Sequence, residues 1–489
     1  LQNELLLTAH TDWTAEHPRP TIALARAKHI EDFYDPKYWQ RWHEHLSDHA
    51  LPELRREDGD HIEVGASPLF TEKGWLLVYS YIQNYYDEHK RIFSIEVALL
   101  DHDNPQKLIS RTEPILVPQE FYEEYGIVPN IVFPSGATLG ERGMLEIWYS
   151  AADTVCAKVV LKLRDLLFAL DPERPARTFL RAPENPILSP RGDGFESHDV
   201  LNAGAIDIDG SIYILYRAMD KANTSTIGLA VSRDGIHIDE RLSEPIYKPR
   251  ADFEQKKGSP TGNSGCEDPR IVRIGNQLHM TYTAYDGVRA PSGAVSSIGV
   301  DDFLARRFDM WSTPSLLTPE NIDDKDLSLL PEKIKGNYLL YHRINNRLCA
   351  DLLPDLTSGK HVTRCIEILG PRKGMWDSEK VGSAAPPIKV GLPGKGHNWL
   401  MIYHGVSRHG KYRLGAALLA GDGTTLLSRT ADPIFEPLEK YELEGEVSNV
   451  VFSCGAVVRG DNLIMYYGGA DRVVGVATSS LAHIVDALS

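Results

Sequence analysis

The segment from Asn263 to Arg270 gathers residue types that could carry out acid catalysis. It places Glu267 beside Asp268, with a proline next and Arg270 after it. Two adjacent carboxylates in a cleft cannot both stay ionised unless a cation pairs with them, so one of them has a raised pKa or a partner such as Arg270. Such a pair can supply an acid catalyst and its support. An Asp-Pro turn with a surface ion pair explains the same residues equally well.

Two later segments also end in a carboxylate. Tyr282 to Tyr285 leads into Asp286, and Tyr466 to Ala470 leads into Asp471. A single aspartate at the end of a strand usually closes a turn. If these strands occupy equivalent places in a repeated fold, their ends converge on one region. A carboxylate that recurs at equivalent strand ends then favours a shared binding site.

A set of basic residues occupies the middle of the C-terminal half. Arg and Lys side chains that converge in a concave site suit an oxyanion or phosphate, whereas scattered ones are solvated surface. Lys333 precedes an expected strand, His342 and Arg343 close it, and His404 closes the next comparable strand. The set comprises Lys325, Lys333, His342, Arg343, Lys380 and His404.

From about residue 200 onward, the sequence predicts short strands separated by turn residues, and these strands must position the side chains named above. Five apolar, aromatic strands each follow a turn and each contain a tyrosine, and the tyrosines are 66, 59, 62 and 63 residues apart. This period predicts an all-β fold, a five-bladed β-propeller. A β-sandwich is the alternative, but it has no such higher period. The tyrosines are Tyr216, Tyr282, Tyr341, Tyr403 and Tyr466.

A second repeat joins the two ends of the chain. Residues 98–137 match residues 417–456 at a constant offset of 319, including Gly126 with Gly445 and Asn130 with Asn449. Residues 1–170 are therefore expected to be a partial copy of the last blades, with an amphipathic outer helix within 28–57, and residues 181–489 the complete propeller. The earlier blades of the N-terminal copy are expected to be absent from this chain.

Composition excludes several classes of protein. The 489 residues carry a net charge of −16, which argues against nucleic acid and anionic membrane surfaces, and no apolar run approaches the ~20 residues of a bilayer span. Residues 1–13 lack the pattern of a signal peptide. The five cysteines are scattered and without metal-type spacing, which predicts reduced thiols in a cytoplasmic protein.

The motifs, in their order, resemble glycoside hydrolase family 130, the inverting β-mannoside phosphorylases and related mannosidases. The resemblance covers roughly residues 185–489. It is carried by Gly265–Arg270, Tyr282–Asp286, Asp324–Asp326, Leu330–Ile334, Tyr341–Arg343, Gly382–Ile388, Tyr403–Gly405, Tyr412–Leu419 and Asn449–Asp471.

The resemblance implies a five-bladed propeller that acts on β-mannosides, with Asp268 as general acid and no metal site. Lys380 stands where the family has Arg, which keeps the charge but loses bidentate geometry. The N-terminal copy keeps Asp153 but has Ser80 opposite His404 and lacks Glu-Asp-Pro-Arg, so we expect it to be non-catalytic. The substrate-binding residues would be Asn202, Arg217, Glu267, Asp286 and Asp471, and the phosphate-binding residues Arg270, Lys333, His342, Arg343, Lys380 and His404.

One acid and a cationic pocket are sufficient for inverting phosphorolysis, because phosphate is already an anionic nucleophile. The expected partners are a β-mannoside oligosaccharide and inorganic phosphate, the co-substrate, and the expected product is α-mannose 1-phosphate. No other cofactor is expected. The chain could form a homo-oligomer. One alternative is a β-mannosidase, which needs a second carboxylate such as Glu332 as base, ~6.5–9.5 Å from the acid. Another is a non-catalytic sugar-binding propeller.

Overall fold

Strands dominate the fold, which is all-β. The structure is a computed structural model that describes residues 3–10, 19–57, 59–172, 179–357, 361–391, 397–486 and 488. The longest helix in these ranges is α1 (Pro36–Glu44), of nine residues. Within the described residues, no helix has the length and apolar character needed to cross a membrane.

The chain divides into two compact units, each described here by itself. Unit 1 comprises Leu1–Arg174 with Lys373–Met375, and unit 2 comprises Pro175–Arg372 with Trp376–Ser489. The expected boundary between residues 170 and 181 falls mostly on residues 173–178, which lie outside the described residues.

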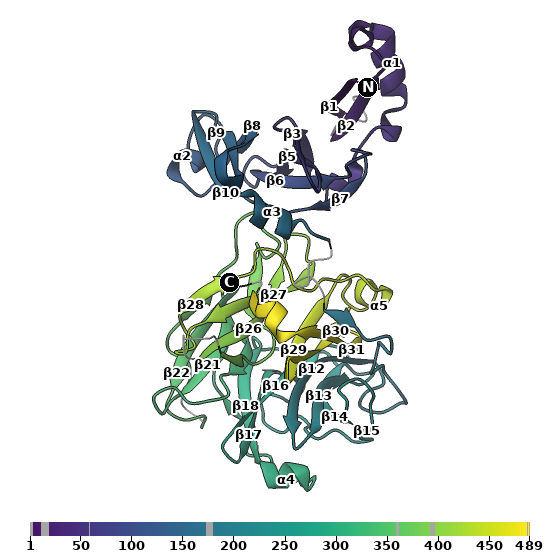
Figure 1. The fold of residues 1–489 in the computed structure, drawn as a ribbon. Helices are drawn as coiled ribbons and strands as arrows, with labels where there is room; N and C mark the ends of the chain where they lie inside the picture. Colours follow the sequence, from purple (N-terminus) through teal and green to yellow (C-terminus); the bar gives the residue numbers. More distant parts are fainter. Residues whose placement is uncertain are drawn as a thin grey trace. The chain divides into compact units, whose positions relative to one another are not determined.

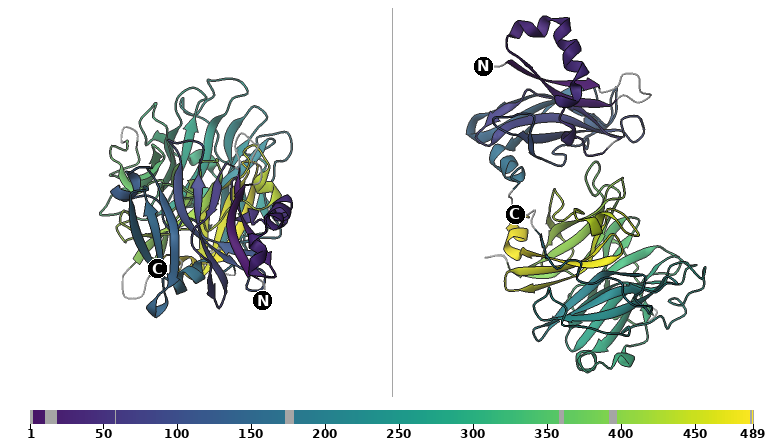
Figure 2. Two further views of the ribbon diagram at one scale, coloured as in Figure 1. Left: turned by 90° about the horizontal axis from the view of Figure 1, so that it is seen from above. Right: turned by 90° about the vertical axis from the view of Figure 1, so that its right-hand side faces the viewer.

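Unit 1 begins with an antiparallel pair, β1 (Asn3–His10) and β2 (Pro20–Ala27), against which α1 packs (Figures 1 and 2). Tyr38 donates a hydrogen bond to the Arg26 carbonyl, and the Trp42 indole donates one to the Leu24 carbonyl, at 2.9 and 3.2 Å. The segment 28–57 thus contains the expected helix. It also contains three 3₁₀ turns, η1 (Ile30–Tyr34), η2 (Leu46–Asp48) and η3 (Pro52–Leu54).

Two antiparallel sheets form the rest of unit 1, and their facing apolar side chains make its core. The first contains β3 (His61–Val64), β4 (Leu69–Thr71), β5 (Gly74–Gln83), β6 (Ile92–Leu100) and β7 (Leu108–Arg111). The second contains β8 (Val132–Leu139), β9 (Met144–Ala151) and β10 (Val155–Lys162). Of the short helices, α2 (Phe121–Glu124) lies between the two sheets in the chain, η4 (Glu141–Gly143) lies between β8 and β9, and α3 (Leu163–Ala169) follows β10.

Unit 2 consists of five strand groups in chain order, numbered here 1 to 5. Group 1 is β12 (Asp199–Ile208), β13 (Ser211–Met219), β14 (Thr224–Ser232) and β15 (Glu240–Arg241). Group 2 is β16 (Ser264–Ile274), β17 (Gln277–Tyr285), β18 (Ser292–Gly299) and β19 (Ser315–Leu316). Group 3 is β20 (Asp324–Leu329), β21 (Tyr338–Ile344), β22 (Arg347–Leu353) and β23 (Ile366–Leu369).

Groups 4 and 5 complete unit 2. Group 4 is β24 (Lys380–Ser383), β25 (Ile388–Gly391), β26 (His397–Val406), β27 (Tyr412–Leu419) and β28 (Leu426–Arg429). Group 5 is β29 (Val451–Arg459), β30 (Asn462–Gly469) and β31 (Val473–Ser480), with β11 (Leu180–Arg181) paired to β31. The helical segments are α4 (Val300–Leu304), η6 (Phe308–Met310), α5 (Lys440–Leu443) and α6 (Leu481–Asp486).

The five repeated tyrosines occupy the second principal strand of each group and are fully buried. A buried phenol needs a hydrogen-bond partner. Tyr216 donates to Glu196, Tyr403 to Asp377 and Tyr466 to the Gly235 carbonyl, at 2.7, 3.1 and 2.8 Å. The period in the sequence therefore corresponds to one buried, hydrogen-bonded tyrosine in each group.

The matched segments of the two units share local geometry. Asn130 and Asn449 both have φ of +61°, and Asp153 and Asp471 have φ of +50° and +54°. α2 and α5 each begin with a reciprocal glutamate cap. These are the features that a duplicated pair of strand groups would share.

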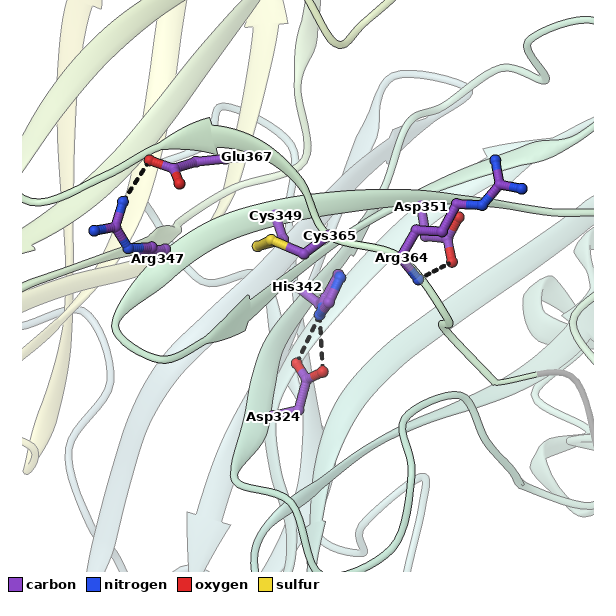
Figure 3. The surroundings of a disulfide bond; sticks show 8 residues. All are labelled: Asp324, His342, Arg347, Cys349, Asp351, Arg364, Cys365 and Glu367. Carbon is purple, nitrogen blue, oxygen red and sulfur yellow. Dashed lines mark hydrogen bonds and ion pairs between the residues drawn. A yellow bond between two sulfur atoms is a disulfide. The ribbon is translucent and has the colours of Figure 1, made fainter.

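The prediction that all cysteines are reduced is wrong for one pair, because Cys349 and Cys365 form a disulfide (Figure 3). They are 16 residues apart in the chain, but pairing of β22 with β23 brings their Cα atoms to 4.9 Å. Spacing alone could not reveal this contact because it depends on the strand register. Cys156 is a free, exposed thiol, and Cys266 and Cys454 are free and buried.

Candidate active site

A cavity of about 190 Å³ in unit 2 receives side chains from all five strand groups. One side of it is rich in carboxylates and the other in basic groups. Its lining consists of Asn202, Arg217, Glu267, Asp268, Lys325, Asp326, Arg343, His404, Tyr412, Val447, Val450, Phe452 and Asp471.

Backbone bulges aim three of these side chains into the cavity. The pairing register shifts at the same place in the first strand of groups 1, 2 and 3, and the bulges contain Asn202, Asp268 and Asp326. Their φ angles are +49°, +51° and +57°. Asn and Asp enter this left-handed region more readily than most residues, and bulges commonly redirect a side chain near an active site.

Asp268 lies at the centre of the acidic side. Its Oδ1 accepts hydrogen bonds from Asn202 Nδ2 at 2.8 Å and from Arg217 Nη1 at 3.3 Å. Arg217 Nη2 also donates to Glu267 Oε1 at 2.9 Å. Burial raises the pKa of Glu267, although the Arg217 charge opposes this. Burial and the nearby Asp268 raise the pKa of Asp471 to about 6. Three carboxyl groups thus surround one guanidinium, which favours at least one protonated acid.

Lys325 and Arg343 form the basic side. They are direct cross-strand partners on β20 and β21. Asp326 lies 2.7 Å from Arg343 Nε. Burial alone would raise the pKa of Asp326, but the surrounding charges, of which Arg343 is the strongest, together hold it well below its usual range. Within the described ranges, no carboxylate forms an ion pair with Lys325. One carboxylate between two cations leaves positive charge for an anionic ligand.

His404 lies in the same region but is not a cation at neutral pH. It is 1% exposed, and burial lowers its pKa to about 3 despite the opposing charge of Asp326. Its Nε2 is 3.5 Å from Asp326 Oδ2, and its ring stacks on Tyr412. His404 can therefore offer a phosphate a neutral hydrogen bond, not a charge.

Comparison with known proteins identifies the family. The sequence profile of glycoside hydrolase family 130, described as beta-1,4-mannooligosaccharide phosphorylase, matches residues 41–171 and 181–489. The chain belongs to glycoside hydrolase family 130. The match to residues 41–171 shows that unit 1 carries family sequence as well.

Individual family 130 relatives cover about three fifths of this chain. A beta-1,2-mannobiose phosphorylase from a Thermoanaerobacter species is 36% identical over 61% of this chain and 95% of its own. A 1,2-beta-oligomannan phosphorylase from the same source is 34% identical over 62% of this chain and 98% of its own. The solved complex of the Listeria innocua beta-1,2-mannobiose phosphorylase with beta-1,2-mannobiose has a TM-score of 0.51 and 27% identity, and covers 63% and 98% of the two chains.

The pocket brings together seven of the twelve predicted site residues of this family 130 chain. These are Asn202, Arg217, Glu267, Asp268, Arg343, His404 and Asp471. The other five do not line the pocket.

Three predicted phosphate ligands, Arg270, His342 and Lys380, are absent from the pocket lining. Arg270 is 1% exposed and donates to the carbonyls of Ser383 and Ala384, at 2.8 and 2.7 Å, so its donors already bind the backbone. His342 is hydrogen-bonded through Nδ1 to Asp324 at 2.8 Å (Figure 3). It is the neighbour of Arg343 on β21, so the alternation of a strand sends the two side chains to opposite faces. Lys380 is half-buried, and its Nζ lies 3.4 Å from the Tyr412 hydroxyl. Burial and the Arg343 charge lower the pKa of Lys380.

The structure does not bring Lys333 or Asp286 to the pocket. Lys333 is exposed in the turn before β21, with its Nζ 4.0 Å from the Tyr338 ring centre. Tyr338 and Arg343 are five residues apart on β21, about 17 Å along a strand. Asp286 accepts the backbone N–H groups of Val288 and Arg289 and the Arg289 Nε, so it closes a turn beside a separate small cavity.

Sequence reasoning assigned no role to Asp326, Tyr412 or Phe452, although all three line the pocket. Asp326 could have been found by aligning the first strand of each group, because it occupies the same bulge as Asn202 and Asp268. Tyr412 and Phe452 carry no comparable signal, since aromatic residues on strands are usually core.

Proposed function

We propose that this family 130 protein is an inverting β-mannoside phosphorylase that transfers a mannosyl group to inorganic phosphate and releases α-mannose 1-phosphate. The observation that supports this most strongly is the division of one small pocket into an acidic side around Asp268 and a basic side around Lys325 and Arg343. Phosphorolysis needs both an acid for the leaving oxygen and a place for an anion, and the two lie in one cavity.

Asp268 is the proposed general acid. It gives a proton to the glycosidic oxygen as the bond from that oxygen to the mannosyl C1 breaks. A phosphate oxygen forms the new bond to C1 from the opposite face, so the configuration inverts. Arg217 and Asn202, which bind Asp268 at 3.3 and 2.8 Å, fix the position of the acid.

Lys325 and Arg343 are the proposed phosphate ligands, with His404 as a neutral partner. A phosphate dianion would neutralise the opposed charges of the two cations and accept their N–H groups in charge-assisted hydrogen bonds. The buried Arg343 keeps its position through Asp326. Arg270, His342 and Lys380 would then support this wall, and Lys333 would take no part.

The hydrolytic alternative needs a carboxylate base in the pocket. Glu332 does not supply it, because its Oε2 pairs with Lys389 at 2.7 Å and it does not line the cavity. Asp326 is held by Arg343, which makes it a weak base. A purely sugar-binding role would not require the acid and the cations in one cavity.

The relatives named for 1,2-β-linked mannosides make β-1,2-mannobiose the first substrate to test. The enzyme should be incubated with β-1,2-mannobiose, with and without phosphate, and products followed by ³¹P and ¹H NMR. We expect α-mannose 1-phosphate and mannose in equal amounts, only when phosphate is present. Release of mannose at the same rate without phosphate would identify a hydrolase.

We also propose that the five strand groups are the blades of a five-bladed propeller. Arg270 in group 2 binds carbonyls of group 4, and β11 pairs with the last strand of group 5. Apolar residues of groups 1 and 5 share one core cluster. Unit 1 is proposed to be a non-catalytic copy of the last two blades. Location in the cytoplasm, a homo-oligomeric state and catalysis without a metal stay predictions.

A further inference from the structure

Three potential metal ligands meet at one place outside the reaction machinery. These are His198, Asp199 and Glu446, and one ligand atom from each lies within 4.8 Å of the others. Asp199 is 2% exposed, His198 is half-buried and Glu446 is exposed. The cluster therefore has a buried floor and an open side.

The buried carboxylate in this cluster has an unused oxygen. Asp199 Oδ2 is in hydrogen-bond contact with His198 Nδ1, but Asp199 Oδ1 is buried and has no hydrogen-bond partner among the described residues. Buried polar atoms nearly always have a partner, so this one calls for a ligand. Arg472 lies nearby, but forms no ion pair with Asp199 in the described part of the chain. A cation would satisfy the unused oxygen directly.

Backbone contacts place the cluster at the rim of the pocket. Val200 N donates to the Arg472 carbonyl, and Val447 N donates to the Ala470 carbonyl, both at 3.2 Å. The segments that carry the three ligands thus meet at the turn that holds Asp471. Asp471 and Val447 both line the cavity.

The copy in unit 1 shows that the loop itself does not need the acid. Val128 N donates to the Ala152 carbonyl at 3.2 Å, as Val447 does to Ala470. In the matched register, Ile127 of unit 1, which is 80% exposed, corresponds to Glu446. The carboxylate is therefore present in unit 2, where His198 and Asp199 lie close to it, and a requirement of the loop fold does not explain it.

We propose that His198, Asp199 and Glu446 bind one divalent transition-metal cation at the rim of the pocket. One imidazole and two carboxylates form a ligand set that suits Zn²⁺ or Mn²⁺, whereas Ca²⁺ and Mg²⁺ prefer oxygen ligands alone. Three protein ligands leave coordination positions for water or for a sugar hydroxyl on the open side. The proposed chemical step does not need this ion.

The experiment uses the full chain, treated with EDTA and dialysed into phosphate-free buffer. MnCl₂ binding is followed by electron paramagnetic resonance and ZnCl₂ binding by calorimetry. We expect one ion per chain, and at least a tenfold weaker Kd in His198→Asn and in Glu446→Gln. The matched control is Glu444→Gln, which removes an exposed carboxylate of the same loop, paired with Lys440 at 3.7 Å. Its Kd should equal that of the wild type.

Two outcomes would overturn the proposal. One is that no ion saturates at one per chain. The other is that His198→Asn and Glu446→Gln bind as the wild type and Glu444→Gln do, which would show adventitious binding elsewhere. Circular dichroism of each variant checks its fold. The experiment measures metal binding, so its result does not depend on whether the protein catalyses phosphorolysis.

Discussion

Lys325 and Arg343 stand directly opposite each other in the pairing of β20 with β21, so an ammonium and a guanidinium share one wall of the pocket. Like charges in directly opposed positions destabilise a sheet. Asp326 pairs with Arg343 and offsets only one of the two charges. The fold alone disfavours such an arrangement, which supports the proposal of an anionic substrate at this wall.

Lys325→Ala should therefore impair the use of phosphate. The lost charge-assisted hydrogen bond is worth about 1.5–3 kcal/mol, so the KM for phosphate should rise by about ten- to a hundredfold. The KM for β-1,2-mannobiose should change much less. Steady-state kinetics with each substrate varied in turn measures both values.

The matched control for Lys325→Ala is Lys333→Ala, which removes an exposed lysine at the other end of the same hairpin. It should behave as the wild type. Equal effects of the two substitutions would mean that the pocket cations act only through the overall charge of the protein.

Asp268→Asn should slow the reaction without unfolding the protein. The amide keeps the size of the carboxyl but cannot give a proton to the leaving sugar. The rate on β-1,2-mannobiose should fall by about 10²–10⁴-fold. An aryl β-mannoside with an acidic phenol as leaving group needs little proton donation, so its rate should fall far less. Equal losses on both substrates would point to a positioning role for Asp268.

The strand architecture was largely predictable, because one tyrosine recurs in each group at a nearly constant spacing. On the acidic side of the pocket, the Glu-Asp-Pro-Arg segment indicated Asp268 and the place after a strand indicated Asp471, whereas Asn202 and Arg217 followed only from the family resemblance. Spacing says where along a strand a residue lies, but it does not say which face the side chain takes. His342 and Arg343 are adjacent, and alternation sends only Arg343 into the pocket.

The remaining differences also have physical causes. Lys333 and Arg343 belong to the same hairpin, but a strand of several residues separates its two ends. Asp286 accepts hydrogen bonds from two backbone N–H groups of its own turn. It therefore closes a turn, as a single aspartate at the end of a strand usually does. The neutral state of His404 depends on its complete burial, which the sequence does not encode locally.

Reactivity towards a thiol reagent should divide the five cysteines into three classes. The native protein should react with a maleimide at Cys156, which is exposed, while Cys266 and Cys454 react only after unfolding. Cys349 and Cys365 should react only after reduction. Peptide mapping by mass spectrometry without reductant should recover the linked peptide. Free Cys349 and Cys365 in protein purified without reductant would contradict the disulfide.

Asp471→Asn should stabilise the protein in a pH-dependent manner. Burial and Asp268 raise the pKa of Asp471 from 3.8 to about 6, so its ionised form is less favourable in the folded state than in the unfolded chain. As the pH rises from about 4 through 6, the wild type therefore loses stability that the neutral amide retains. The gain for Asp471→Asn should be about 1–3 kcal/mol at pH 8 and should shrink as the pH falls through 6 towards 4. Urea unfolding at several pH values measures it, and Asp153→Asn, at the exposed equivalent position in unit 1, should show no such gain. A pH-independent effect of Asp471→Asn would mean that the burial of its charge does not limit stability.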